Sequence, residues 1–137
     1  MKRFLILLAA LLLTGCAAAP ASEPFFCFTD STGAQVSLPA MPRKTAVLFS
    51  SHVEVWRLAG GTVDITVGES VERGFASENA VLVDGGAGKT IDTEKLLASK
   101  PDFVIGSSDI PAQVEACTMA ARAGIPAALF RVDTFAD

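Results

Sequence analysis

Apolar residues along the chain form short runs that are separated by turns and by segments with helical spacing. Residues 26–29 and 35–38 flank the turn-rich tetrad Asp30-Ser31-Thr32-Gly33, which predicts a β-hairpin. Four later runs are predicted strands: residues 45–49, 62–67, 103–105 and 127–130. The run 45–49 is apolar enough to be buried on both faces, whereas 62–67 alternates and fits a strand exposed on one face.

Helical segments separate these strands. The first is predicted from Ser51, as N-cap of a capping box with Glu54, to about Ala59, where Gly60-Gly61 ends it. Asp92 is predicted to cap the next helix, with Ile91 and Leu96 at staple positions, and Lys100-Pro101 ends it.

A third helix is predicted to begin at Pro111 and to end at Gly124, with Val114, Cys117 and Ala121 on its buried face. Strands that alternate with helices of about ten residues imply right-handed crossovers and a parallel sheet covered on both faces. The predicted fold is therefore α/β: a three-layer αβα lobe with a mainly parallel central sheet, preceded by the hairpin.

The N-terminus has the features of a targeting segment. Lys2 and Arg3 precede an apolar stretch, residues 4–13, which suits a signal peptide and is too short to span a bilayer. Leu13-Thr14-Gly15-Cys16 matches the bacterial lipobox. We expect residues 1–15 to be a lipoprotein signal peptide and Cys16 to carry the lipid; an ordinary secretory signal with a chance cysteine is the alternative. Residues 16–24 are small, polar or Pro-containing, as in a flexible linker.

Composition limits the remaining function classes. The 137 residues are 50% hydrophobic and 19% charged, which predicts one folded domain over residues 25–137. Net charge is −4, becoming −6 if Lys2 and Arg3 are removed, and the absence of any basic run excludes a nucleic-acid binder. One His and three Cys form neither a CxxC nor an HxxxH pair, so no metal site is expected. Cys27 and Cys117 are expected either to form a disulfide or to remain as two buried thiols.

Polar residues follow each predicted strand. Parallel sheets bind ligands at the carboxyl ends of their strands, so these residues are candidate ligand contacts. They are Ser50, Ser51, His52, Glu69, Ser107 and Ser108. Serine and glycine also serve in caps and turns, so only their recurrence at successive strand ends favours a binding edge.

No catalytic constellation emerges from the sequence. Residues 85–90 end like a phosphate-binding loop, but Val83 stands where that pattern requires glycine. His52 has no nucleophile in an elbow motif and is interpreted as a ligand contact or a solvated cap. Glu69 and Glu72 are expected to be solvated in a polar loop beside Arg73. The protein is therefore not expected to be an enzyme, and no cofactor is expected.

Several segments in order resemble the N-terminal lobe of substrate-binding lipoproteins that serve ABC importers for ferric siderophores, haem and cobalamin. They are the lipobox, FTDSTGAQVSLP, SSHVEVWRLAGG, KLLASKPDFVIGSS and QVEACTMAARAGIPAALF. The resemblance implies a ligand that is a metal chelate, contacted by the strand-end residues above. It also implies that an acidic residue docks to the permease. Glu115 is the nearest match, although a first-turn carboxylate stabilised by the helix dipole is an equal interpretation.

The resemblance also implies a second lobe and a long linking helix, both of which this sequence lacks. A partial gene, a single expressed lobe and a natural one-lobe protein are the three explanations, and the first is the expected one. The predicted function is capture of a ferric siderophore or related chelate outside the cytoplasm, on a lipid-anchored lobe, for delivery to an ABC permease. The alternative is an anchored α/β lobe that binds a partner protein through its uncovered surface.

Overall fold

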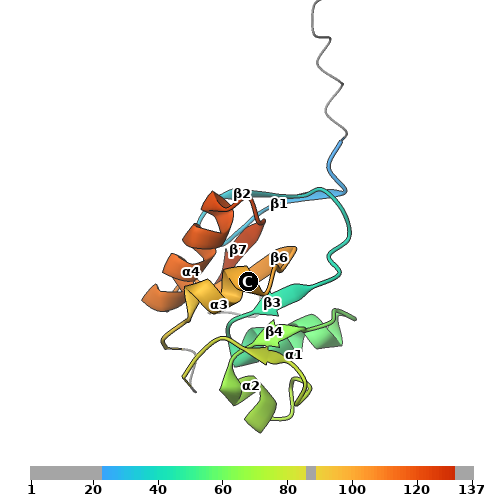
Figure 1. Ribbon diagram of the computed structural model, residues 1–137. Coiled ribbons are helices and arrows are strands. Elements are labelled where there is room, and N and C mark those ends of the chain that lie inside the picture. The colour runs from blue at the N-terminus through green and yellow to red at the C-terminus, as the bar shows by residue number, and fades with distance from the viewer. Residues whose placement is uncertain (1–22, 86–88, 132–137) are drawn as a thin grey trace, which may run out of the picture.

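A five-stranded parallel sheet forms the centre of the protein (Figure 1). The computed structural model describes residues 23–85 and 89–131. The strands are β3 (Thr45–Val47), β4 (Ile65–Thr66), β5 (Val81–Leu82), β6 (Phe103–Ser107) and β7 (Ala127–Phe130), in the spatial order β5-β4-β3-β6-β7. All four pairings are parallel, so the predicted α/β class and parallel sheet are confirmed.

A separate hairpin precedes the sheet, as predicted. Strands β1 (Phe26–Thr29) and β2 (Gln35–Leu38) pair antiparallel. The Asp30 carboxylate holds the turn by accepting hydrogen bonds from the Thr32 and Ala34 N–H groups and from the Thr32 hydroxyl. Its other oxygen accepts from the N–H of Leu129 in β7, at 3.0 Å, and therefore fastens the hairpin to the sheet. Burial alone would raise the pKa of Asp30, but these hydrogen bonds outweigh it and lower that pKa.

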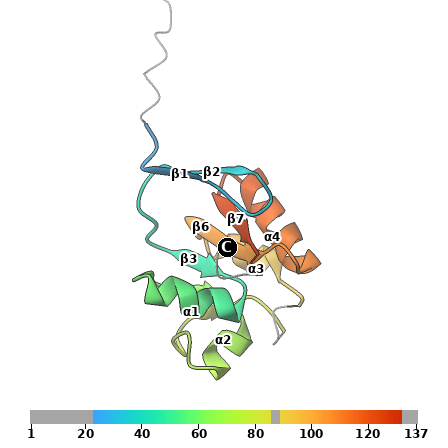
Figure 2. The same cartoon turned by 180° about the vertical axis from the view of Figure 1, so that it is seen from behind.

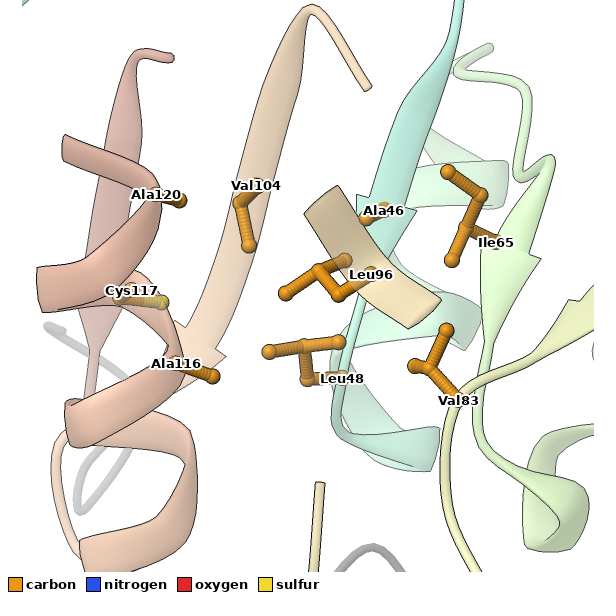
Figure 3. Close-up of a cluster of buried hydrophobic side chains, with 9 residues drawn as sticks. All are labelled: Ala46, Leu48, Ile65, Val83, Leu96, Val104, Ala116, Cys117 and Ala120. Atoms are coloured by element: carbon orange, nitrogen blue, oxygen red, sulfur yellow. The ribbon is translucent and has the colours of Figure 1, made fainter. Parts of the chain in front are cut away.

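Four helices connect the strands: α1 (Ser50–Leu58), α2 (Gly68–Glu72), α3 (Thr93–Ala98) and α4 (Pro111–Arg122). Helices α3 and α4 cover one face of the sheet, where Leu96 and Ala116 contact side chains such as Leu48 and Val104 (Figure 3). The hairpin and α1 lie on the other face (Figure 2), where Leu38 and Val53 belong to a second buried cluster. The side chains of β3 alternate between the two clusters, which is what a strand buried on both faces requires.

Helix boundaries show where the sequence pattern was misleading. The capping box at Ser51 is wrong: extended Phe49 is the N-cap of α1 and no side chain caps it. Asp92 does cap α3, since its carboxylate accepts from the Lys95 N–H at 2.8 Å. Pro111 begins α4 as predicted.

The buried face of α4 differs from the predicted one. It carries Gln113, Ala116, Cys117 and Ala120, whereas Ala121 is exposed. Gly106 in β6 explains the close contact of this face with the sheet, because a Cβ there would lie 2.9 Å from the Cys117 sulfur. Cys117 is a free, buried thiol with a pKa raised to about 12 by burial and by the charge of Asp30.

Two further predictions need correction. Residues 62–67 form only the two-residue strand β4, which is buried on both faces rather than exposed on one. Cys27 is free and exposed, so neither the disulfide with Cys117 nor a pair of buried thiols is correct. The lipobox, most of the linker and residues 86–88 of the rejected phosphate loop lie outside the described residues. Among the described residues, no helix is long and apolar enough to cross a bilayer.

Candidate functional site

The order of the strands reverses between β3 and β6. The chain runs outward from β3 to β4 and β5, then returns to add β6 and β7 on the other side of β3. In open parallel sheets, ligands bind beside such a reversal, at the carboxyl ends of the strands. Ser50 follows β3 and Ser107 ends β6, so two of the predicted candidates flank this point. We call this side of the sheet the carboxyl edge.

A buried glutamine joins the two strands at the reversal. Gln113 of α4 donates from its side-chain amide to the Leu48 carbonyl at 2.7 Å and accepts from the Ser107 N–H at 2.8 Å. The side chain is fully buried. These two backbone groups lie at the end of the hydrogen-bond ladder between β3 and β6, and the Gln113 side chain supplies their partners. Gln113 was not predicted as a site residue, because a single glutamine in a helix gives no sign of partners 65 residues away.

Arg73 links two of the predicted site residues. Its guanidinium donates to the Ser50 hydroxyl at 3.2 Å and lies 3.5 Å from the Glu69 carboxylate. Glu69 and Glu72 belong to α2, so the expected polar loop is wrong, and Glu69 is ion-paired rather than only solvated. The Arg73 and Glu69 side chains remain 45% and 37% exposed, which leaves both charges open to a ligand.

A second polar group lies after β6 and β7. The Ser107 hydroxyl accepts from the Asp109 N–H at 3.3 Å, and the Ser108 N–H donates to the Phe130 carbonyl at 3.0 Å. Arg131 lies 3.7 Å from the Asp109 carboxylate, and both of these side chains are 57% exposed. Arg131 was not predicted as a site residue.

His52 is neither a solvated cap nor an open base. It is 8% exposed and meets the rings of Phe49 and Phe130 edge-on, with ring centres 5.1 and 6.3 Å away. Its Nδ1 atom is buried and has no hydrogen-bond partner among the described residues. Burial lowers the pKa of His52, because the charged form loses its hydration. Burial therefore favours the neutral form of His52.

An apolar groove of about 550 Å³ opens beside His52, between α1 and the hairpin. We call it the aromatic groove. Its lining combines the ring side chains Phe25, Phe26, Phe28, His52, Trp56, Phe103 and Phe130 with Leu38, Met41, Pro42, Val55, Ala59, Ile105 and Arg131. Trp56 is fixed by a 2.8 Å bond from its indole N–H to the Thr62 carbonyl, and a Cβ at Gly61 would collide with its ring.

The predicted site residues therefore differ in what they can offer a ligand. Ser50 and Ser107 are 1% and 4% exposed, and their hydroxyl groups accept hydrogen bonds from within the protein. Ser51, Glu69 and Ser108 are partly exposed at the carboxyl edge. No group of three or more His, Cys, Asp or Glu side chains within residues 23–85 and 89–131 is placed to hold a metal ion.

Glu115 lies beyond the first turn of α4, so the interpretation as a first-turn carboxylate is wrong. It is exposed on the helix that packs against β6 and β7. The helix is also the fourth of the fold rather than the third, because α2 was not predicted. Exposure leaves Glu115 available for contact with another protein.

Solved structures share this fold. The siderophore-binding protein BauB, bound to ferric iron with two acinetobactin molecules, is 16% identical, with a TM-score of 0.61. The haem-binding protein HmuT is 21% identical, with a TM-score of 0.64. PiuA, an iron-uptake ABC transporter substrate-binding protein from Streptococcus pneumoniae, is 19% identical, with a TM-score of 0.62. The chain has the fold of chelate-binding proteins. The resemblance seen in the sequence is confirmed at the level of fold.

The similarity covers most of this chain and a minority of the others. It spans 81%, 83% and 81% of this chain, but only 38%, 36% and 38% of BauB, HmuT and PiuA. The chain thus corresponds to little more than a third of the length of these neighbours. No protein-family model matches the chain, and no curated protein matches it.

Proposed function

We propose that this chain is the extracytoplasmic solute-binding component, or one lobe of it, of an ABC importer for a ferric siderophore or a related chelate such as haem or cobalamin. The observation that carries the proposal is the fold shared with proteins that bind such ligands, together with a carboxyl edge that offers partly exposed hydroxyl and charged groups. Cys16 would carry the lipid that holds the protein to the outer side of the membrane.

The carboxyl edge suits an anionic or polar chelate. Arg73 and Arg131 stand at either side of the strand reversal, each more than 40% exposed. Ser51 and Ser108 supply hydroxyl groups at the same edge. Glu69 partly neutralises the positive charge of Arg73. Ser50, His52 and Ser107 would support this edge from within, since all three are buried. The ligand itself supplies the metal, so the protein needs no metal site of its own.

Binding is tested by thermal unfolding with a ferric hydroxamate siderophore, a ferric catecholate siderophore, haemin and cyanocobalamin. A ligand that binds only the folded state raises the midpoint of unfolding, by an amount that grows with the logarithm of its concentration above the Kd. Replacing both Ser51 and Ser108 with alanine should weaken binding about thirtyfold, since each of the two lost hydrogen bonds costs about 1 kcal/mol. Ser37→Ala, on the exposed face of β2, is the matched control and should leave binding unchanged. No midpoint shift with any of the four chelates would contradict the proposal.

Permease docking through Glu115 requires a separate measurement. Glu115→Gln should leave chelate binding unchanged and lower chelate uptake by cells that express the importer. Glu94→Gln, an exposed carboxylate on α3, is the control and should leave uptake unchanged. Equal uptake by both variants would remove Glu115 from the proposal without affecting the ligand site.

One observation favours a second function of a different class, that of a protein-interaction module. The aromatic groove leaves a continuous apolar surface that is characteristic of contact sites. This alternative predicts no stabilisation by any chelate, so the same thermal experiment separates the two functions.

A further inference from the structure

The rim of the aromatic groove is unusually apolar for a surface. Phe25, Phe26, Met41 and Val55 all line the groove and are 58%, 55%, 67% and 61% exposed. They come from the start of the described chain, from the loop after β2 and from α1, so three separate segments present apolar side chains on one face. Isolated exposed apolar residues need no explanation, but a cluster of this kind marks a contact surface.

Charge sets this face apart from the rest of the molecule. The chain carries 15 acidic side chains, yet none of the residues that line the aromatic groove is acidic. The one charged lining residue is Arg131, which lies at the rim and pairs with Asp109. A surface that is aromatic, free of carboxylates and edged by a cation matches the composition of protein surfaces that sit at a membrane interface.

The first groove residue is also close in sequence to the predicted anchor. Phe25 is only nine residues after Cys16, and a fully extended chain of that length spans about 30 Å. A lipid on Cys16 would therefore keep the first groove residues within that distance of the bilayer. Tethering raises the effective concentration of membrane at the groove, so even a weak apolar contact would be populated.

We propose that the aromatic groove docks on the hydrocarbon of the bilayer that anchors Cys16. Phe25, Phe26 and Met41 enter the interfacial region, and lipid acyl chains cover the groove. The proposal goes beyond solute binding and rests on the Cys16 anchor from the proposed function. A second copy of the chain is the competing occupant, but no tether holds a second copy near the groove, whereas the Cys16 lipid would hold the bilayer there.

Trp56 provides a direct reporter of this contact. It is the only tryptophan in the chain, it lines the groove, and its indole is held by the Thr62 carbonyl. Bromine atoms on lipid acyl chains quench tryptophan emission only over short distances. Quenching of Trp56 therefore reports that lipid chains reach the groove.

The experiment uses the full chain, expressed in bacteria so that the N-terminus is processed, and reconstituted into phosphatidylcholine vesicles with or without brominated acyl chains. Mass measurement of the N-terminal peptide establishes whether Cys16 is lipidated. We expect Trp56 emission to fall about twofold or more in the brominated vesicles, as tethering keeps the groove on the bilayer. Met41→Asp and Val55→Asp should each abolish most of this quenching, because a carboxylate resists transfer into hydrocarbon.

Met119→Asp is the matched control. Met119 is 39% exposed on α4, on the opposite side of the sheet from the groove, so its substitution should leave quenching unchanged. All three substituted positions are exposed, and circular dichroism confirms that each variant is folded.

Three results would overturn the proposal. The first is no quenching in a protein whose Cys16 is lipidated. The second is equal quenching in the wild type and both groove variants. The third is a dimer, seen by sedimentation, that Met41→Asp dissociates while lipid quenching is absent; the groove would then bind a second copy. An unmodified Cys16 would also overturn the proposal, because docking rests on the lipid anchor. Chelate binding is measured separately by thermal unfolding, so this result would not affect the solute-binding proposal.

Discussion

The two faces of the sheet differ in how completely they are covered. On the α3/α4 face, nine buried residues form a closed cluster, including the fully buried Leu96 and Val104 (Figure 3). On the α1/hairpin face, a buried layer is present, but Phe28, Trp56 and Phe130 are only partly buried and line an open groove. One face therefore supplies stability within this chain, whereas the other leaves apolar side chains exposed for contact with another molecule.

The largest expected effect tests the closed face. Leu96→Ala removes a side chain with no exposure and should lower the free energy of unfolding by about 2–5 kcal/mol, because the surrounding cluster cannot collapse into the cavity. Denaturant unfolding measures this loss. A loss as small as that of an exposed residue would show that this face is not tightly packed.

The attachment of the hairpin is the next test. Asp30→Asn keeps the shape of the side chain but turns one acceptor oxygen into a donor, so we expect a loss of about 1.5–3 kcal/mol at pH 7. The folded pKa of Asp30 is lowered from 3.8. Its contribution is therefore complete above the unfolded pKa and is lost as the pH falls through the lower folded value. The difference in unfolding free energy between the two proteins should begin to shrink below about pH 4 and disappear below the lowered folded pKa, and a constant difference would contradict this assignment.

Close contact between α4 and β6 gives a third test. Gly106→Ala places a Cβ 2.9 Å from the Cys117 sulfur and 3.3 Å from the Leu129 side chain. We expect a loss of about 1–3 kcal/mol from overpacking, measured by denaturant unfolding. Combining it with Cys117→Ala should restore part of the loss, because the sulfur is the nearest obstacle. No recovery in the double variant would place the strain elsewhere.

The smallest effect is expected on the open face. Val55→Ala alters a side chain that is 61% exposed in the groove, so the free energy of unfolding should change by no more than about 0.5 kcal/mol. A larger loss would indicate that the groove is closed in solution and would remove the contrast between the two faces.

Sequence patterns predicted the elements whose signal is local. The hairpin strands 26–29 and 35–38, and the strand 127–130, match the structure residue for residue. Asp92 and Pro111 were identified because cap and first-turn chemistry depends on nearby residues. By contrast, α2 has five residues and β5 has two, too few to show a helical or alternating period.

The site was less predictable than the fold. Parallel topology does bring Ser50 and Ser107 to one edge, but their hydroxyls are engaged by Arg73 and by the Asp109 N–H. Such pairing depends on contacts across 23 residues in the case of Ser50, which no local pattern encodes. The aromatic groove was also missed as a feature, since its lining comes from five separate parts of the chain.

The turn of the hairpin also covers the outer edge of the sheet. β7 is the last strand of the sheet, and its outer backbone groups would be a template for another chain. Asp30 and Ser31 occupy them: the Leu129 N–H and carbonyl and the Arg131 N–H are all bonded to these two residues. The turn therefore blocks the edge of β7 against pairing with a strand of another chain. The protein exposes an apolar groove, but the edge of β7, where strand pairing with another chain would begin, is covered.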